Sequence, residues 1–218
     1  MEKLYYHLTS VSLDASLEVI SPPDRGRGDR RFCQTCFNVL KRDEPIDIRI
    51  DALRPRTRHF DVTELWDVNV IHTSLLDLLG REHVERDLLL GTVTNKKGHV
   101  VEGWHTVIGR ERLILRGNPH FWKGKAMFGA GCCKECGLLH CHGAAPRYLC
   151  PGPTSDRVIR QSDTTCLIIP ASLKEAINLK RGSGYALEKL PVLESPRDGM
   201  PIELSCEPGK RIETTLTG

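Results

Sequence analysis

Nine cysteines are the residues of this sequence with the clearest chemical potential. Four of them form two Cys-x-x-Cys pairs, Cys33 with Cys36 and Cys133 with Cys136. A CxxC turn brings two thiolates within reach of one metal ion, and two such pairs supply the four ligands of a tetrahedral structural zinc site. The spacing therefore predicts one structural zinc ion bound by Cys33, Cys36, Cys133 and Cys136.

The two pairs differ in sequence context and lie far apart in the chain. Gly137 follows the second pair and suits the positive φ that this position often needs, whereas Phe37 follows the first. Closing the loop over residues 37–132 costs on the order of 4 kcal/mol. Structural zinc binding is worth roughly 10–16 kcal/mol in small peptides, so the energetics allow a long-range site.

A local zinc site within residues 132–150 is the main alternative. This stretch holds enough thiolates and imidazoles to complete a site without the first pair, or to bind a second metal ion. Its donors are Cys132, Cys133, Cys136, His140, Cys141, His142 and Cys150. Spacing alone leaves both arrangements open.

Catalytic chemistry has less support in the sequence. A zinc ion with four thiolate ligands has no open position for a substrate, and no HExxH, GxSxG, P-loop or GxGxxG pattern occurs in a suitable context. A thiol-dependent enzyme that uses Cys132 or Cys141 stays as an alternative, since His140 and His142 flank Cys141. We expect a protein that is not an enzyme and has no catalytic residues.

The composition is that of a folded protein. Of the 218 residues, 39% are hydrophobic and 27% are charged, which is typical of a globular chain. The formal net charge of +3 is too small to indicate nucleic-acid binding by itself.

No apolar run approaches the roughly 20 residues of a membrane helix. The N-terminus has no signal-peptide core, so we expect a cytoplasmic protein. In the reducing cytoplasm, cysteines bind metal more readily than they form disulfides.

An α+β fold is predicted for the elements that position the cysteines. Antiparallel strands with few helices should surround the zinc-knuckle pair. The clearest strands are residues 88–94 and 99–108, which the segment Asn95–Gly98 joins as a hairpin. Other strands are expected at residues 46–50 and 165–169, with an edge strand at residues 3–8.

Two helices are predicted among the strands. Residues 61–85 read as partly helical, with Thr73 or Ser74 as the cap and three leucines on one face. These leucines are Leu75, Leu76 and Leu79. A capping box from Ser172 to Glu175 opens the second helix. With the strands before and after it, this helix forms a closing strand–helix–strand unit.

The domain organisation follows from these elements. We expect a single zinc-clipped domain over residues 1–195, with knuckles at residues 33–36 and 133–137. A C-terminal tail over residues 196–218 carries Pro, Gly and Thr with little periodicity, and it is the segment most prone to disorder.

As a whole, the pattern resembles the double-CXXCG-motif family of bacterial proteins, which is well represented in myxobacteria. The resemblance spans roughly residues 1–195. The matching elements, in order, are a short N-terminal strand at residues 3–6, Cys33 and Cys36, a long middle region, Cys133–Gly137, Arg160–Ile169, Leu173–Ile177 and Tyr185–Val192. Members of this family are regarded as immunity proteins of polymorphic toxin systems. The resemblance therefore implies that the protein binds a cognate toxin inside the producing cell and blocks it.

The partner surface is expected on two loops beside the knuckles, because loops on a rigid scaffold commonly carry recognition residues. These loops are residues 24–31 and 117–125. Their candidate partner-binding residues are Arg27, Arg30, His120 and Trp122.

Nucleic-acid binding by a zinc-ribbon module is the alternative function. Basic residues near zinc knuckles often contact phosphates. The residues that would form such a patch are Arg25, Arg27, Arg30, Arg31, Lys123 and Lys125. The nearly balanced charge of the chain argues for toxin binding over this alternative.

Overall fold

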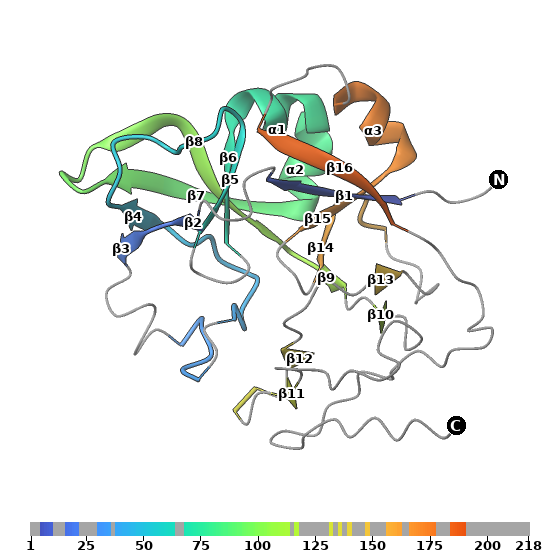
Figure 1. Cartoon of the computed structure of the whole chain (residues 1–218), viewed down its shortest axis with the longest axis horizontal. Helices are drawn as coiled ribbons and strands as arrows, with labels where there is room; N and C mark the ends of the chain where they lie inside the picture. The colour runs from blue at the N-terminus through green and yellow to red at the C-terminus, as the bar shows by residue number, and fades with distance from the viewer. Residues whose placement is uncertain are drawn as a thin grey trace, which may run out of the picture. The chain divides into compact units, whose positions relative to one another are not determined.

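The computed structural model describes residues 5–10, 16–21, 30–35, 38–63, 68–113, 116–117, 131–132, 135–136, 139–140, 147–148, 156–162, 166–177 and 184–190. It confirms the predicted α+β class, with mainly antiparallel sheets and few helices (Figure 1). The chain divides into two compact units, residues 1–113 with 155–189, and residues 114–154 with 190–218. The single domain over residues 1–195 and the tail after it stay predictions.

A seven-stranded sheet forms the larger part of the first unit. Its long hairpin matches the prediction, because Leu88 pairs with Gly109 at one end and Asn95 closes the turn at the other. The Asn95 side chain accepts hydrogen bonds from the backbone N–H groups of Lys97 and His99, at 2.9 and 3.2 Å. In spatial order the strands are β2 (Ser16–Leu17), β5 (Phe60–Thr63), β6 (Asn69–His72), β8 (Val100–Gly109), β7 (Leu88–Asn95), β4 (Ile48–Ile50) and β3 (Val19–Ser21).

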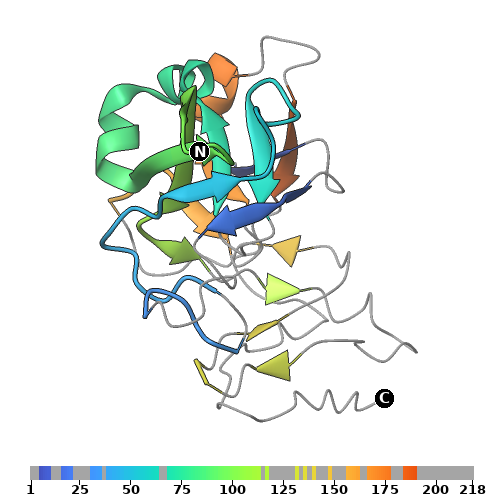
Figure 2. The ribbon, with the colours of Figure 1, turned by 90° about the vertical axis from the view of Figure 1, so that its left-hand side faces the viewer.

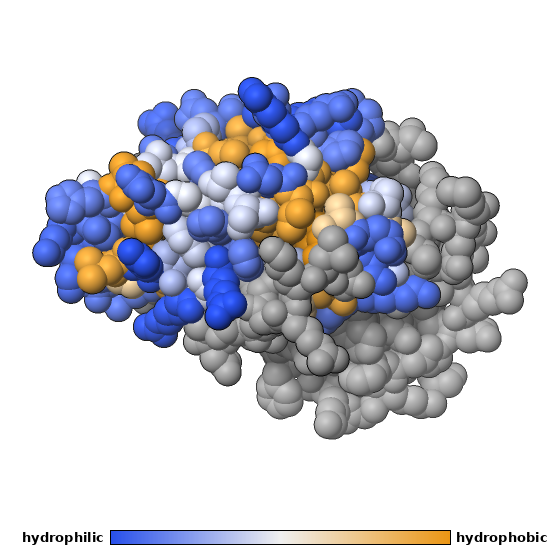
Figure 3. Space-filling view, turned by 90° about the horizontal axis from the view of Figure 1, so that it is seen from above, coloured by the Kyte–Doolittle hydropathy of each residue, from blue (hydrophilic) through white to orange (hydrophobic). Residues whose placement is uncertain are grey.

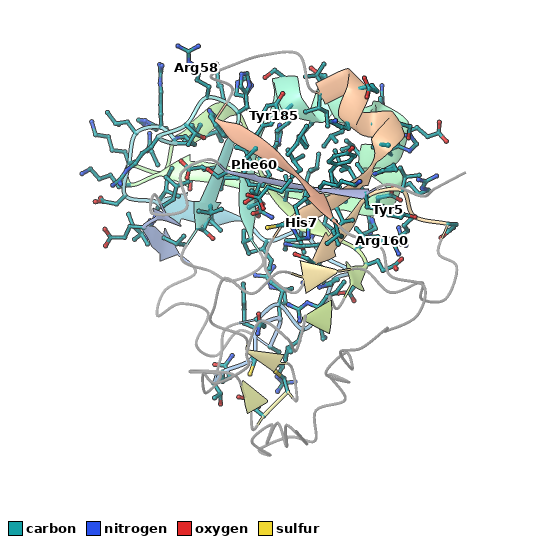
Figure 4. The ribbon with its side chains drawn as sticks, turned by 45° about the vertical axis from the view of Figure 1, so that its right-hand side comes forward. Tyr5, His7, Arg58, Phe60, Arg160 and Tyr185 are labelled. Atoms are coloured by element: carbon teal, nitrogen blue, oxygen red, sulfur yellow. The ribbon has the colours of Figure 1, made fainter. Side chains whose placement is uncertain are left out.

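A five-stranded sheet completes the first unit. Its spatial order is β16 (Tyr185–Leu190), β1 (Tyr5–Ser10), β15 (Leu167–Pro170), β14 (Arg160–Ser162) and β9 (Arg112–Leu113). The prediction of an edge strand near the N-terminus was wrong, because β1 lies between β16 and β15. Arg160 of β14 reaches across the sheet and lies 5.6 Å from the ring centre of Tyr5 on β1 (Figure 4).

Three short helices lie on one side of the strands of the first unit (Figures 1 and 2). They are α1 (Thr73–Leu79), α2 (Arg81–Asp87) and α3 (Ala171–Ile177). The closing strand–helix–strand unit is confirmed as β15, α3 and β16. The three predicted leucines of α1 are buried, but its N-cap is His72 rather than Thr73 or Ser74. Part of the region expected to be helical forms β5 and β6 instead.

Both faces of the seven-stranded sheet carry buried apolar side chains. Adjacent residues of a strand point to opposite faces. Accordingly, Val70 and Ile108 belong to one hydrophobic cluster, while Ile71 and Val107 belong to another. The second cluster also contains side chains from α1, α2, α3 and the five-stranded sheet, so the two sheets and the helices share a core.

A buried polar junction marks the point where the chain passes from one sheet to the other. Gly109 ends β8, and β9 begins three residues later and pairs in parallel with β14. The Arg42 guanidinium donates hydrogen bonds to the Gly109 carbonyl at 2.8 Å and to Gln161 Oε1 at 2.7 Å. Gln161 Oε1 also accepts a hydrogen bond from Gly109 N–H at 2.9 Å. These bonds fasten β14 to the end of β8.

A buried carboxylate makes a second connection between distant segments. The Asp87 side chain is fully buried and accepts hydrogen bonds from the backbone N–H groups of Val158 and Ile159, at 2.9 and 2.8 Å. Arg86 donates to both of its oxygens, at 2.7 and 3.0 Å. Burial raises the pKa of Asp87, but the hydrogen bonds from Arg86, Ile159 and Val158 outweigh it, and the net pKa lies below its ordinary value.

Replacing this carboxylate tests its structural role. We expect Asp87→Asn to lower the free energy of unfolding by about 3 kcal/mol, because it leaves buried donors and a partly buried cation without their charged acceptor. Urea unfolding monitored by circular dichroism measures the difference. The matched control is Glu85→Gln, which removes an exposed carboxylate 2.6 Å from Arg81 and should leave stability nearly unchanged. Equal losses in the two variants would contradict the role of Asp87.

Candidate metal centre and histidine cluster

The first cysteine pair belongs to a hairpin anchored in the hydrophobic core. Phe32 and Val39 form an antiparallel bridge, and the Cys33 N–H donates a hydrogen bond to the Asn38 carbonyl at 2.9 Å. Phe32 and Val39 are buried in the first hydrophobic cluster, and Cys33 is itself fully buried. The backbone that leads into and out of the CxxC turn is therefore fixed by core packing.

The second pair is framed in the same way. Strands β11 (Gly131–Cys132) and β12 (Leu139–His140) are antiparallel, with Cys132 opposite Leu139. In both hairpins the residue just before the first cysteine of the pair lies opposite the third residue after the second cysteine. Cys136 lies in the turn and is half-buried. The two CxxC segments therefore have identical hairpin register.

The zinc site stays a prediction. Cys36 and Cys133 lie outside the described residues, as do Cys141, His142 and Cys150 of the local alternative. Among the residues that the structure describes, no group of three or more His, Cys, Asp or Glu side chains is arranged to hold a metal ion. The choice between the long-range and local sites stays open.

The predicted partner residues fall mostly outside the described chain. Arg30 is exposed in a turn. Arg27, His120 and Trp122 lie outside the described residues. The described helices include none long and apolar enough to cross a membrane.

A cluster of histidines, which the sequence did not single out as a group, lies at the start of α1. The hydroxyl oxygen of Ser74 is 2.8 Å from Nδ1 of His59 and 2.9 Å from Nδ1 of His72. The His59 ring meets the ring of Tyr185 edge-on, and the His72 ring meets that of Trp104, with ring centres 6.3 and 5.2 Å apart. Residues from the loop before β5 and from β6, β8, β16 and α1 therefore converge on one hydroxyl group and its surroundings.

The hydrogen-bond pattern assigns the tautomers of the two histidines. The backbone N–H of Ser74 donates to His72 Nδ1 at 3.2 Å, so this nitrogen carries no proton. The Ser74 hydroxyl then donates to His72 Nδ1 and accepts from His59 Nδ1–H. Through Nδ1, His72 serves as the N-cap of α1.

His105 extends the cluster on β8. Its Nε2 lies 3.2 Å from the hydroxyl oxygen of Thr73, the first residue of α1. Burial lowers the pKa of His105, the neighbouring His72 lowers it further, and a hydrogen bond with the Gly91 backbone opposes both effects. Gly103 makes room beside this cluster, since a Cβ there would lie 2.7 Å from His72 Nε2.

This cluster could be anticipated only in part from the sequence. His105 beside Trp104 stands out as a polar residue within a strand, but the three histidines follow no motif spacing. Their convergence depends on the pairing of β6 with both β5 and β8, which brings His72 opposite Trp104. The arrangement fixes the start of α1.

The lowered pKa of His105 gives a pH dependence of folding. The unfolded chain binds a proton near the ordinary pKa of 6.5, whereas the folded chain resists it. Stability is therefore fully present above about pH 6.5 and is lost as the pH falls below it. We expect His105→Gln to lose less stability than the native chain between about pH 7.5 and pH 5.5, as measured by urea unfolding. The exposed control, His99→Gln, should keep the native dependence; identical profiles for all three proteins would contradict this prediction.

Comparison with protein-family models and with curated proteins finds no match to this sequence. The resemblance to the double-CXXCG-motif family therefore stays an expectation based on the residues that carry it.

Proposed function

We propose that this chain is a zinc-binding, non-enzymatic protein of the immunity type, which binds a cognate protein toxin and blocks it. One observation carries the zinc part of the proposal: the two CxxC segments share the same hairpin register. A zinc knuckle needs both of its thiolates on one tight turn between paired backbone segments. Two separate CxxC turns with the same framing suit two halves of one tetrahedral site.

The chemistry of the donors also fits zinc. Cys33 is fully buried, and a buried thiolate without a compensating charge is strongly disfavoured. A zinc ion supplies that charge and uses the thiolate as a ligand. Cys33, Cys36, Cys133 and Cys136 would complete its coordination, which leaves no position for a substrate and makes the ion structural.

The toxin-binding part of the proposal rests on the family resemblance. The closing unit that carries much of this resemblance is present as β15, α3 and β16. Immunity proteins act through a recognition surface, so the fold needs a stable scaffold and exposed anchoring residues rather than a catalytic site. The proposed anchors are Arg27, Arg30, His120 and Trp122.

Metal analysis tests the zinc proposal. Protein purified without added metal should contain about one equivalent of zinc, and the double variant Cys33→Ser/Cys36→Ser should contain almost none. Chelation should lower the melting temperature, because zinc binding is coupled to folding.

The control for this experiment is Cys166→Ser, which changes a half-buried cysteine outside both pairs and should keep the zinc. Full zinc content in the double variant would favour the local site within residues 132–150. An unchanged melting transition after verified loss of zinc would contradict a structural role.

Binding measurements test the proposed anchors. Toxin candidates encoded beside this gene would be titrated with the native protein by calorimetry. Arg30→Ala and Trp122→Ala should each weaken binding to the cognate toxin by more than about 1 kcal/mol if these side chains are anchors. Arg81→Ala on α2 is the matched control and should bind normally. Normal affinity in both test variants, with folding intact, would place the interface elsewhere.

A further inference from the structure

The loop between β4 and β5 carries an unusual concentration of positive charge. Its segment Leu53–His59 has the sequence LRPRTRH, with three arginines and no acidic residue. The formal net charge of the whole 218-residue chain is +3, and this segment alone carries +3, so the charges in the rest of the chain balance. We call this segment the arginine loop.

All three guanidinium groups of the arginine loop are available at the surface. Arg54, Arg56 and Arg58 are exposed. Figure 4 shows Arg58 pointing outward, away from Phe60 and Tyr185. The nearest acidic residue before the loop in sequence is Asp51, and its carboxylate pairs with Lys96 at 3.5 Å. Asp61, two residues after the loop, is buried and interacts electrostatically with Arg56. All three guanidinium groups are nevertheless exposed to an external ligand.

Hydrogen bonds to a buried carboxylate hold the backbone of the arginine loop in place. Asp61 is fully buried, and its Oδ2 accepts hydrogen bonds from the backbone N–H groups of Arg56 and Thr57, at 2.9 and 3.4 Å. Its Oδ1 accepts from Val62 N–H at 2.9 Å. The Thr57 hydroxyl donates a further hydrogen bond to the Phe60 carbonyl. Exposed arginines on an anchored backbone bind with less loss of conformational entropy than those on a free loop.

A strand from the other sheet also supports the arginine loop. Gly184 lies just before β16 and packs closely against the loop. A Cβ at this position would lie 3.0 Å from the Thr57 side chain and 3.1 Å from the backbone nitrogen of Arg58. The His59 carbonyl accepts a hydrogen bond from the His72 N–H at 2.9 Å, which fixes the end of the loop to β6. The loop is therefore anchored both to β6 and to the segment just before β16.

An exposed apolar residue belongs to the same loop. Leu53 at the start of the loop is 64% exposed, the most exposed large hydrophobic residue that the structure describes. Seen from above, hydrophobic patches interrupt a mainly hydrophilic surface in the first unit (Figure 3). Protein interfaces are enriched in arginine and depleted in lysine. An exposed leucine can add an apolar contact to such an interface, whereas phosphate binding depends on charge.

From this arrangement we infer that the arginine loop is a docking surface for an acidic segment of a partner protein. Guanidinium groups bind carboxylates through paired hydrogen bonds, and Leu53 supplies an apolar contact next to them. Within the proposed function, the inference implies that the toxin presents carboxylates to this loop. The chemistry of the loop can nevertheless be tested without the toxin.

The test compares two fluorescent ligands of equal net negative charge by anisotropy. One is a short peptide of glutamate and leucine, and the other is a single-stranded oligonucleotide of thymidine. The native full-length protein should bind the peptide more tightly than the oligonucleotide. The triple variant Arg54→Gln/Arg56→Gln/Arg58→Gln should bind the peptide at least about tenfold more weakly.

Two further variants separate charge from geometry and from apolar contact. The triple Arg→Lys variant keeps the charge but loses paired hydrogen bonds, so it should lie between the native and glutamine proteins. Leu53→Ser should weaken peptide binding by about threefold and leave oligonucleotide binding unchanged. The matched control Lys96→Gln/Lys97→Gln removes exposed lysines of the neighbouring turn and should bind the peptide within about twofold of the native protein.

Several outcomes would overturn the inference. These are absent peptide binding by the native protein, equal binding by the glutamine variant, or tighter binding of the oligonucleotide with no effect of Leu53→Ser. Circular dichroism checks that every variant is folded. Zinc content is measured on the same samples. Intact peptide binding by protein that contains no zinc would contradict the metal proposal but would support the docking role of the arginine loop.

Discussion

A partly buried arginine at the crossing between the two sheets makes the interaction on which the rest of the first unit depends. Burial lowers the pKa of Arg42 to about 10, so the side chain stays charged at neutral pH. A shift of this size corresponds to an electrostatic cost of about 3 kcal/mol. The hydrogen bonds from its Nη1 to Gly109 and Gln161 hold the charged group at this position. Only glycine fits at position 109, because a Cβ there would lie 2.7 Å from the Gln161 Cβ.

This junction also reaches the first cysteine hairpin. Arg42 follows the hairpin by only three residues, and Arg112 of β9 donates to the Asn38 side chain at 3.4 Å. The Asn38 carbonyl in turn accepts the hydrogen bond from Cys33 N–H. The backbone around Cys33 is thus fixed by the same contacts that join the sheets. A cysteine with a fixed backbone is suited to the proposed structural zinc site, because the backbone holds the thiolate in the position that the metal requires.

Elements that depend on neighbouring residues could be predicted from the sequence. Features that depend on pairing between distant segments could not. Alternation from Leu88 to Ile108 and the Asn95–Gly98 turn were sufficient for the long hairpin, and the leucine spacing was sufficient for the buried face of α1. The position of β1 was not accessible, because a strand's neighbours depend on segments far away in the chain. The same holds for the His72 cap, since histidine is not a common N-cap and gains this role from Ser74. The CxxC spacing located both cysteine pairs, but the shared register of the bridges that flank them depends on backbone pairing.

A single short stretch connects the arginine loop to the histidine cluster. Residues 56–61 contain the backbone donors to Asp61, the Thr57 hydroxyl and His59, whose ring binds Ser74. Tyr185 borders the same stretch: its ring packs against His59, and its hydroxyl donates to the Ile177 carbonyl at the end of α3 at 2.5 Å. A displacement of this backbone would therefore disturb the start of α1 and the end of α3 together. Exposed arginines supported by so many buried contacts can hold a fixed pattern of charge, and a fixed pattern is what distinguishes one acidic partner from another.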